Sequence, residues 1–173
     1  RNLLNPTKMS HLEEQLRQAD AEAAVTGIIL TGSGDVFCGG LDLGAIGEGE
    51  SPVDFASALV SLLRLLPTLT KPVAAAVNGD AVASGAALVA ACDFAVAPPE
   101  AMIGSYEVSV GVWPMVAQVP IIKRIGARAA METGVATRPI TDFEAYRDRL
   151  NSFVLRSGLI MKPIIAAAKA DRS

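Results

Sequence analysis

The sequence has little of the residue types that most often build metal centres or disulfide frameworks. It contains one histidine and two cysteines in 173 residues. His11 has no second histidine or cysteine near it, so we expect neither a metal site nor histidine-based catalysis. Cys38 and Cys92 lie in apolar or small-residue surroundings, and two thiols are too few for a disulfide scaffold. We therefore expect two buried free thiols and a reducing, cytoplasmic location.

The sequence also lacks long apolar runs and an excess of positive charge. No apolar run reaches the roughly 18 residues that a membrane-spanning helix needs, and the polar Arg1-Asn2 start is not signal-like. The net charge of −3 argues against nucleic-acid binding, which favours a basic stripe. Because hydrophobic residues make up 51% of the chain, we expect extensive burial, part of it between subunits. The chain does not begin with methionine, and we expect it to start inside a longer sequence.

The most informative stretch that is present runs from residue 71 to residue 111. Val73–Val77 is short, apolar and partly β-branched, which predicts a buried strand, and Asp93–Ala97 predicts a second one. Between them lies a run of small residues, for which we expect a helix with Ser84 at its N-cap. Glu107 follows as an isolated acid. Free helix amides beside one carboxylate suit chemistry on a carbonyl that becomes an oxyanion; an ordinary turn with an exposed glutamate is the alternative.

A second informative stretch, Phe37–Leu43 (FCGGLDL), follows a predicted strand at Val25–Thr31. Its adjacent glycines allow backbone angles that present consecutive N–H groups to a ligand, although an ordinary loop has the same composition. Asn5-Pro6 and Ser51-Pro52 are typical of helix starts, and we expect the second helix to be buried on several sides. The polar residues after Pro139 predict a boundary between a core, 1–139, and a helical part, 140–173.

Three segments together resemble the enoyl-CoA hydratase/isomerase family, also called the crotonase family. Thr31-Gly32 with FCGGLDL is similar to one family block, KPVAAAVNGDAVASGAALVAACDFAVA to a second, and Met102–Ile122 to a third. The resemblance runs from about Asn2 to Ile140 in the family's order and spacing. It implies an α/β fold, a crotonase-type spiral of β-β-α turns with a helical C-terminal trimerisation part. It also implies that the substrate is an acyl-CoA, so that coenzyme A enters as part of the substrate and no other cofactor is needed. The implied assembly is a homo-trimer or a dimer of trimers.

The resemblance assigns roles by position. It implies that the backbone amides of Leu41 and Ser84 form an oxyanion hole for the thioester carbonyl and that Glu107 is the acid/base. Trp113 is expected to wall the acyl pocket, with core packing as the alternative. The further substrate-binding residues that it implies are Cys38, Gly39, Gly40, Asp42, Leu43 and Gly85.

Departures from the family pattern bear on the reaction. Hydratases of the family use two glutamates twenty positions apart, and the first position here is Ala87, which cannot move a proton. One base and an oxyanion hole suffice for a 1,3-proton shift, so we expect isomerase-like chemistry, with a non-catalytic acyl-CoA-binding protein as the alternative. Asp80 is either an auxiliary acid or a turn residue. A family segment is also missing after Ile140.

Overall fold

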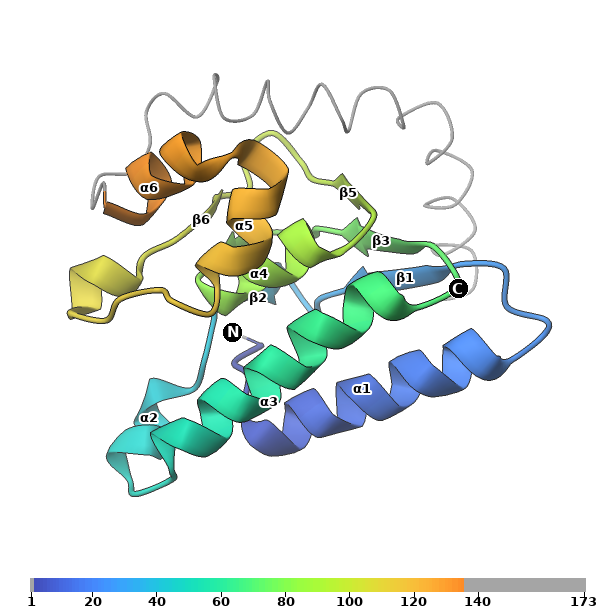
Figure 1. Ribbon diagram of the computed structural model, residues 1–173, viewed down its shortest axis with the longest axis horizontal. Helices are drawn as coiled ribbons and strands as arrows, with labels where there is room; N and C mark the ends of the chain where they lie inside the picture. The colour runs from blue at the N-terminus through green and yellow to red at the C-terminus, as the bar shows by residue number, and fades with distance from the viewer. Residues whose placement is uncertain (1, 136–173) are drawn as a thin grey trace.

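The described part of the chain is built on two parallel sheets. The structure is a computed structural model that describes residues 2–135 (Figure 1). In this range the strands form two three-stranded sheets, one with the order β1-β3-β5 and one with the order β2-β4-β6. The strands are β1 (Ile28–Thr31), β2 (Val36–Cys38), β3 (Val73–Ala76), β4 (Asp80–Val82), β5 (Phe94–Val96) and β6 (Ile103–Gly104).

The chain alternates between the two sheets and then adds helical structure. Each turn contributes one strand to each sheet, as in β1-β2, β3-β4 and β5-β6, before the chain continues into helices. This order confirms the predicted spiral of β-β-α turns. The helices are α1 (Pro6–Ala21), α2 (Leu43–Gly47), α3 (Pro52–Leu65), α4 (Ser84–Ala91), α5 (Gln118–Ile125) and α6 (Ala127–Val135), with 3₁₀ turns η1 (Leu66–Thr68) and η2 (Glu107–Val110). The boundary predicted at Pro139 and the helical part 140–173 lie outside the described residues.

The middle strand of the first sheet, β3, is the better buried of the predicted strands. Val73 and Ala75 are fully buried, and β3 pairs with β1 and β5 on its two sides. Apolar residues on both faces are expected where a parallel sheet is covered on both sides. The strands predicted at 73–77 and 93–97 are therefore confirmed, each slightly shorter than predicted.

Both predicted helix starts are also confirmed. The Asn5 side chain accepts a hydrogen bond from the Lys8 amide at 2.9 Å, and the Ser51 hydroxyl oxygen accepts one from the Asp54 amide at 3.3 Å. Such capping bonds satisfy amides that have no partner within the helix. Val53 in the first turn of α3 is 71% exposed, so the prediction of burial on several sides is wrong for that end of the helix.

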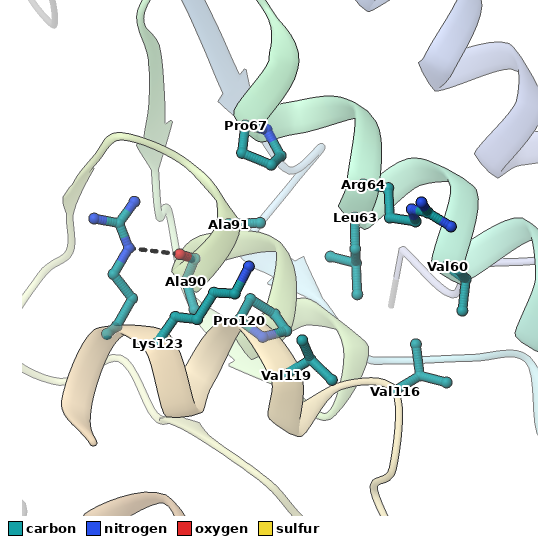
Figure 2. Close-up of a pocket in the computed structure, with 11 residues that line it drawn as sticks. Val60, Leu63, Arg64, Pro67, Ala90, Ala91, Val116, Val119, Pro120 and Lys123 are labelled. Atoms are coloured by element: carbon teal, nitrogen blue, oxygen red, sulfur yellow. Dashed lines mark hydrogen bonds between the residues drawn. The ribbon is translucent and has the colours of Figure 1, made fainter. Parts of the chain in front are cut away.

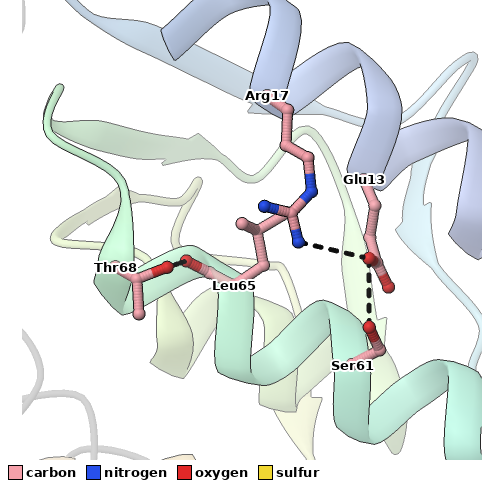
Figure 3. Close-up of polar contacts among 5 residues, drawn as sticks. All are labelled: Glu13, Arg17, Ser61, Leu65 and Thr68. Carbon is pink, nitrogen blue, oxygen red and sulfur yellow. Dashed lines mark hydrogen bonds and ion pairs between the residues drawn. The ribbon is translucent and has the colours of Figure 1, made fainter.

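Helices α1 and α3 lie side by side and cover the sheets from one side (Figure 1). Figure 3 shows a polar contact between them: the Ser61 hydroxyl on α3 donates to Glu13 on α1 at 3.0 Å. Within α1, Arg17 lies 4.0 Å from the same carboxylate. At the end of α3, the Thr68 hydroxyl donates to the Leu65 carbonyl at 2.7 Å. In the described range, no helix is both long enough and apolar enough to cross a membrane.

Candidate functional site

The three residues predicted to act on a substrate follow three neighbouring strands. Leu41 comes three residues after β2 and Ser84 two residues after β4. Glu107 comes three residues after β6. Strand β4 is the middle strand and runs parallel to both neighbours. Because parallel strands end at the same edge of a sheet, the three segments meet at one edge, the usual place for a ligand in α/β proteins.

The loop after β2 touches the start of α4. Gly40 has a backbone φ of +92°, a conformation that favours glycine. A Cβ atom placed on Gly40 would lie 3.1 Å from the Ala83 Cβ and 3.9 Å from the Ser84 amide nitrogen. The two loops that carry the predicted oxyanion amides are therefore in van der Waals contact.

A short bridge to Leu4 fixes the backbone around Leu41. The Leu4 amide donates to the Gly40 carbonyl at 2.9 Å, and the Asp42 amide donates to the Leu4 carbonyl at 2.8 Å. Successive N–H groups of an extended chain point to opposite sides, so the Leu41 N–H points away from Leu4. Within residues 2–135 it donates to no acceptor, which leaves it free for a ligand.

Helix α4 starts one residue earlier than predicted. Ser84 is its first helical residue, and Ala83 is the N-cap, with φ 53° and ψ −119°. The prediction of Ser84 as N-cap is therefore wrong by one position. The Ala83 amide donates to the Gly104 carbonyl at 2.8 Å, so the last bond of the β4–β6 ladder sets this sharp turn. The Ser84 amide, in the first helical turn, has no acceptor among the described residues.

Gly85 lets α4 pack directly on the end of β2. A Cβ atom at Gly85 would lie 2.5 Å from the Cys38 carbonyl oxygen and 2.8 Å from the Cys38 Cβ, closer than packed atoms come. Cys38 is a free cysteine and is 3% exposed. Burial raises the pKa of the Cys38 thiol, which keeps it protonated and unreactive. Gly85 and Cys38 thus affect the site by setting how closely α4 packs on β2, and not through a reactive side chain.

Glu107 begins η2, and the residue two positions before it orients its carboxylate. The Ser105 hydroxyl donates to Glu107 Oε2 at 2.5 Å, and Ser105 is 8% exposed. A buried donor to a carboxylate oxygen restricts the rotamers that this side chain adopts. Sequence reasoning missed Ser105; its spacing of two residues from the predicted base was the available signal.

The structure also places Ala87 and Asp80, the two other positions considered for a catalytic acid. Ala87 is fully buried in the core, so no carboxylate stands at the first of the family's two glutamate positions. Asp80 belongs to strand β4, not to a turn, and its Oδ1 accepts a hydrogen bond from the Met102 amide at 2.9 Å. This bond fixes the chain just before β6, which gives Asp80 a structural role. The turn assignment is therefore wrong.

The remaining predicted residues lie nearer the surface. Trp113 is 52% exposed and Leu43 is 50% exposed, so the core-packing alternative for Trp113 is wrong. The Asp42 side chain accepts a hydrogen bond from the Ala45 amide at 3.3 Å and caps α2. Gly39 lies half-buried between β2 and Gly40. In the described range no group of three His, Cys, Asp or Glu residues is placed to hold a metal ion.

A family model described as enoyl-CoA hydratase/isomerase matches residues 1–165. The chain belongs to the enoyl-CoA hydratase/isomerase family. The structure is also similar to that of enoyl-CoA hydratase from Bacillus anthracis, with a TM-score of 0.79 and 30% identity over 96% of this chain. The 2,3-dehydroadipyl-CoA hydratase of Escherichia coli is 28% identical over 94% of this chain. The chain spans 66% and 64% of these two proteins, less than two thirds of each.

A short part of this family member is similar to a different protein. The NAD-dependent malic enzyme of Rhizobium meliloti is 72% identical to it over 43 residues, which are 25% of this chain and 6% of that enzyme.

Proposed function

We propose that this chain catalyses enoyl-CoA hydratase/isomerase-type chemistry on an acyl-CoA thioester, using one glutamate as acid/base. The observation that supports this proposal best is the convergence of Leu41, Ser84 and Glu107 at one edge of the β2-β4-β6 sheet. Two unpaired backbone amides and one oriented carboxylate are the groups that an enolate-forming reaction needs. Coenzyme A enters as part of the substrate, and no other cofactor is required.

In the proposed reaction the Leu41 and Ser84 amides donate to the thioester carbonyl oxygen. Glu107 removes a proton from C2, and the electron pair of that C–H bond moves toward the carbonyl to give an enolate. The enolate then collapses as the double bond shifts, and Glu107 returns the proton at C4. Loss of one such amide donor costs about 3 kcal/mol of barrier in other enzymes, so both loops must hold their positions.

The absence of a carboxylate at Ala87 favours this proton shift over hydration. A hydratase with two glutamates holds water between them, and a positioned acid or base contributes roughly 10²- to 10⁴-fold in rate. Ala87 is fully buried and has no proton to transfer. Incubating the protein with 3-enoyl-CoA and with 2-enoyl-CoA, while following the absorbance of the conjugated thioester, distinguishes the two reactions.

The role of Glu107 is tested by Glu107→Gln. We expect turnover to fall at least a hundredfold while acyl-CoA affinity changes less than about twofold, because the amides that hold the thioester remain. Glu100→Gln, a change of the same kind at an exposed acid before β6, serves as the control and keeps full activity. Undiminished turnover by Glu107→Gln rules the glutamate out as the base.

A second candidate is a family member that binds acyl-CoA without turning it over. The buried alanine at position 87 supports it, because this position carries one of the two glutamates in hydratases of the family. Binding of 2-enoyl-CoA and 3-enoyl-CoA in calorimetry, with no change in thioester absorbance for either, selects this candidate over the enzyme.

We also propose that copies of the chain associate, as homo-trimers or dimers of trimers in the cytoplasm. Support comes from a row of exposed large apolar side chains that follows Glu107: Val110, Val112, Trp113, Met115, Val119 and Ile122. Exposed large apolar side chains are candidates for burial against another copy of the chain. Met115 is 72% exposed, so Met115→Glu should reduce the mass measured by light scattering, whereas Val53→Glu, at a 71% exposed position on α3, leaves it unchanged.

A further inference from the structure

The serine at the start of α4 brings a side-chain hydroxyl to the candidate site as well as a backbone amide. Within residues 2–135 three polar side chains are buried: Ser84, Ser105 and Gln118. The Ser105 hydroxyl donates to Glu107, and Gln118 Oε1 is covered by protein atoms without a hydrogen-bond partner. The Ser84 hydroxyl differs from both, although only 3% of that residue is exposed.

The Ser84 hydroxyl is unpaired and still open to a ligand. It forms no hydrogen bond with any described residue. In the same range, Gln118 Oε1 is the one side-chain polar atom that is both unpaired and completely covered. Because the Ser84 hydroxyl is unpaired as well, it retains some accessible surface. A hydroxyl at such a position is costly to bury unless water or a ligand pairs with it.

Covalent geometry places this hydroxyl beside the amide that is proposed to bind the thioester. In any staggered rotamer, the Oγ atom of a serine lies roughly 2.9–3.7 Å from its own backbone nitrogen. The Cα–Cβ bonds of a helix also tilt toward its N-terminus, the end at which the Ser84 amide is free. A Cβ atom on Gly40 would lie 3.9 Å from the Ser84 nitrogen, so the loop that carries Leu41 adjoins the same point.

Helix α4 is held at its other end, which fixes the position of Ser84. Arg124 Nε on α5 donates to the Ala90 carbonyl at 2.7 Å, as Figure 2 shows, and Arg124 Nη2 donates to the Cys92 carbonyl. The Arg124 charge compensates the negative C-terminal pole of α4. The positive pole at Ser84 therefore acts with less opposition on an oxygen that becomes negative.

A further donor at this point acts on an enolate more than on the bound thioester. A carbonyl oxygen has two lone pairs, and the amides of Leu41 and Ser84 are proposed to occupy both. The enolate oxygen has three lone pairs and a negative charge, so it accepts one more hydrogen bond, and bonds to charged acceptors are the stronger ones. A donor used only after the charge has formed lowers the barrier without tightening substrate binding.

We propose that the Ser84 hydroxyl is a third oxyanion donor, which hydrogen-bonds the enolate oxygen together with the amides of Leu41 and Ser84. Serine side chains are among the groups that build oxyanion sites. The hydroxyl keeps its own proton and forms no covalent bond, because the proton removed from C2 passes to Glu107. This role rests on the proposed acyl-CoA chemistry and adds a side-chain donor to its two backbone amides.

Ser84→Ala tests this role because it removes the hydroxyl and keeps the amide. We expect kcat to fall about ten- to a hundredfold, the effect of losing a hydrogen bond to a charged group. KM should change less than about twofold, since the bond forms only with the enolate. Ser84→Cys keeps the size of the side chain but has a weak donor, and it should behave as Ser84→Ala does. Ser10→Ala, at an exposed position of α1, should retain the kcat of the parent.

Urea unfolding of the same variants separates this role from a structural one. Ser84→Ala breaks no hydrogen bond among residues 2–135, so the free energy of unfolding should not fall. A lower kcat at undiminished stability supports the third donor. A kcat equal to that of the parent in both Ser84→Ala and Ser84→Cys overturns it.

A readout without turnover separates this inference from the proposed function. Acetoacetyl-CoA is a β-keto thioester whose enolate absorbs in the near ultraviolet, so a titration at fixed pH gives the ratio of bound enolate to bound ketone. We expect this ratio to be at least about tenfold lower in Ser84→Ala than in the parent. Equal ratios overturn the third donor even where both proteins turn over enoyl-CoA. A parent that neither binds acetoacetyl-CoA nor turns over enoyl-CoA overturns the proposed function, and this role with it.

Discussion

Gly40 and Ala83 both have positive φ angles and face each other, one at the end of the loop after β2 and one at the start of α4. Their φ values are +92° and +53°, and a Cβ on Gly40 would approach the Ala83 Cβ to 3.1 Å. Because non-glycine residues rarely adopt positive φ, the turn at Ala83 has a conformational cost that its surroundings must offset. The hydrogen bond from the Ala83 amide to the Gly104 carbonyl helps to offset this conformational cost.

The first prediction concerns this contact. Gly40→Ala should lower the free energy of unfolding by about 1–2 kcal/mol through backbone strain and by roughly a further 1 kcal/mol through crowding against Ala83. Gly34→Ala is the matched control, since Gly34 has a φ of +75° but no atom within 4 Å of an added Cβ. Urea unfolding of both variants measures the difference. Equal losses of stability show that the contact with Ala83 contributes nothing.

The second prediction concerns the orientation of Glu107. Ser105→Ala removes the 2.5 Å hydrogen bond to Glu107 Oε2 and should lower kcat about ten- to a hundredfold, since a hydrogen bond to a charged group contributes roughly 1.5–3 kcal/mol. KM should change little, because Ser105 acts through the carboxylate. Ser109→Ala removes an exposed hydroxyl that donates to the Tyr106 carbonyl and should retain activity. An unchanged kcat for Ser105→Ala excludes the positioning role.

The third prediction concerns alkaline pH. Burial, followed by the nearby Asp93 charge, raises the pKa of the Cys92 thiol from 9.0 to about 12. Between these values the unfolded chain loses the thiol proton while the folded chain keeps it, so stability falls as pH rises from about 9 to 12. This thiol contributes up to about 1.4 kcal/mol per pH unit to the decline. Cys92→Ala should show a shallower decline in urea unfolding; parallel curves contradict the assignment.

The fourth prediction concerns a buried amide without a complete set of hydrogen bonds. Gln118 is 7% exposed, and its Oε1 has no hydrogen-bond partner among the described residues. Gln118→Met keeps the length of the side chain and removes the unsatisfied acceptor, so the free energy of unfolding should rise by about 1 kcal/mol. Gln15→Met, at an exposed position of α1, should change it by less than about 0.5 kcal/mol. A loss of stability at Gln118 instead indicates that Oε1 binds a group outside residues 2–135.

The amino-acid sequence by itself determined the family, both helix starts and three of the six described strands, β1, β3 and β5; the strands of the β2-β4-β6 sheet were not predicted. Short β-branched runs predict strands from the local sequence alone, and Asn5 and Ser51 cap helices through contacts three residues away. Such signals are local, so they can be read without the fold. The three motif blocks also placed Leu41, Ser84 and Glu107 as candidates, because their order and spacing along the chain are properties of the sequence.

Only the tertiary structure decided which segments of the chain lie next to one another. Only the parallel order β2-β4-β6 brings residues 41, 84 and 107 to one edge, and only the turn at Ala83 makes Ser84 the first residue of its helix. The exposure of Trp113 could not be read from the sequence either, because it depends on contacts between segments far apart in the chain. Long-range packing carries no local signature.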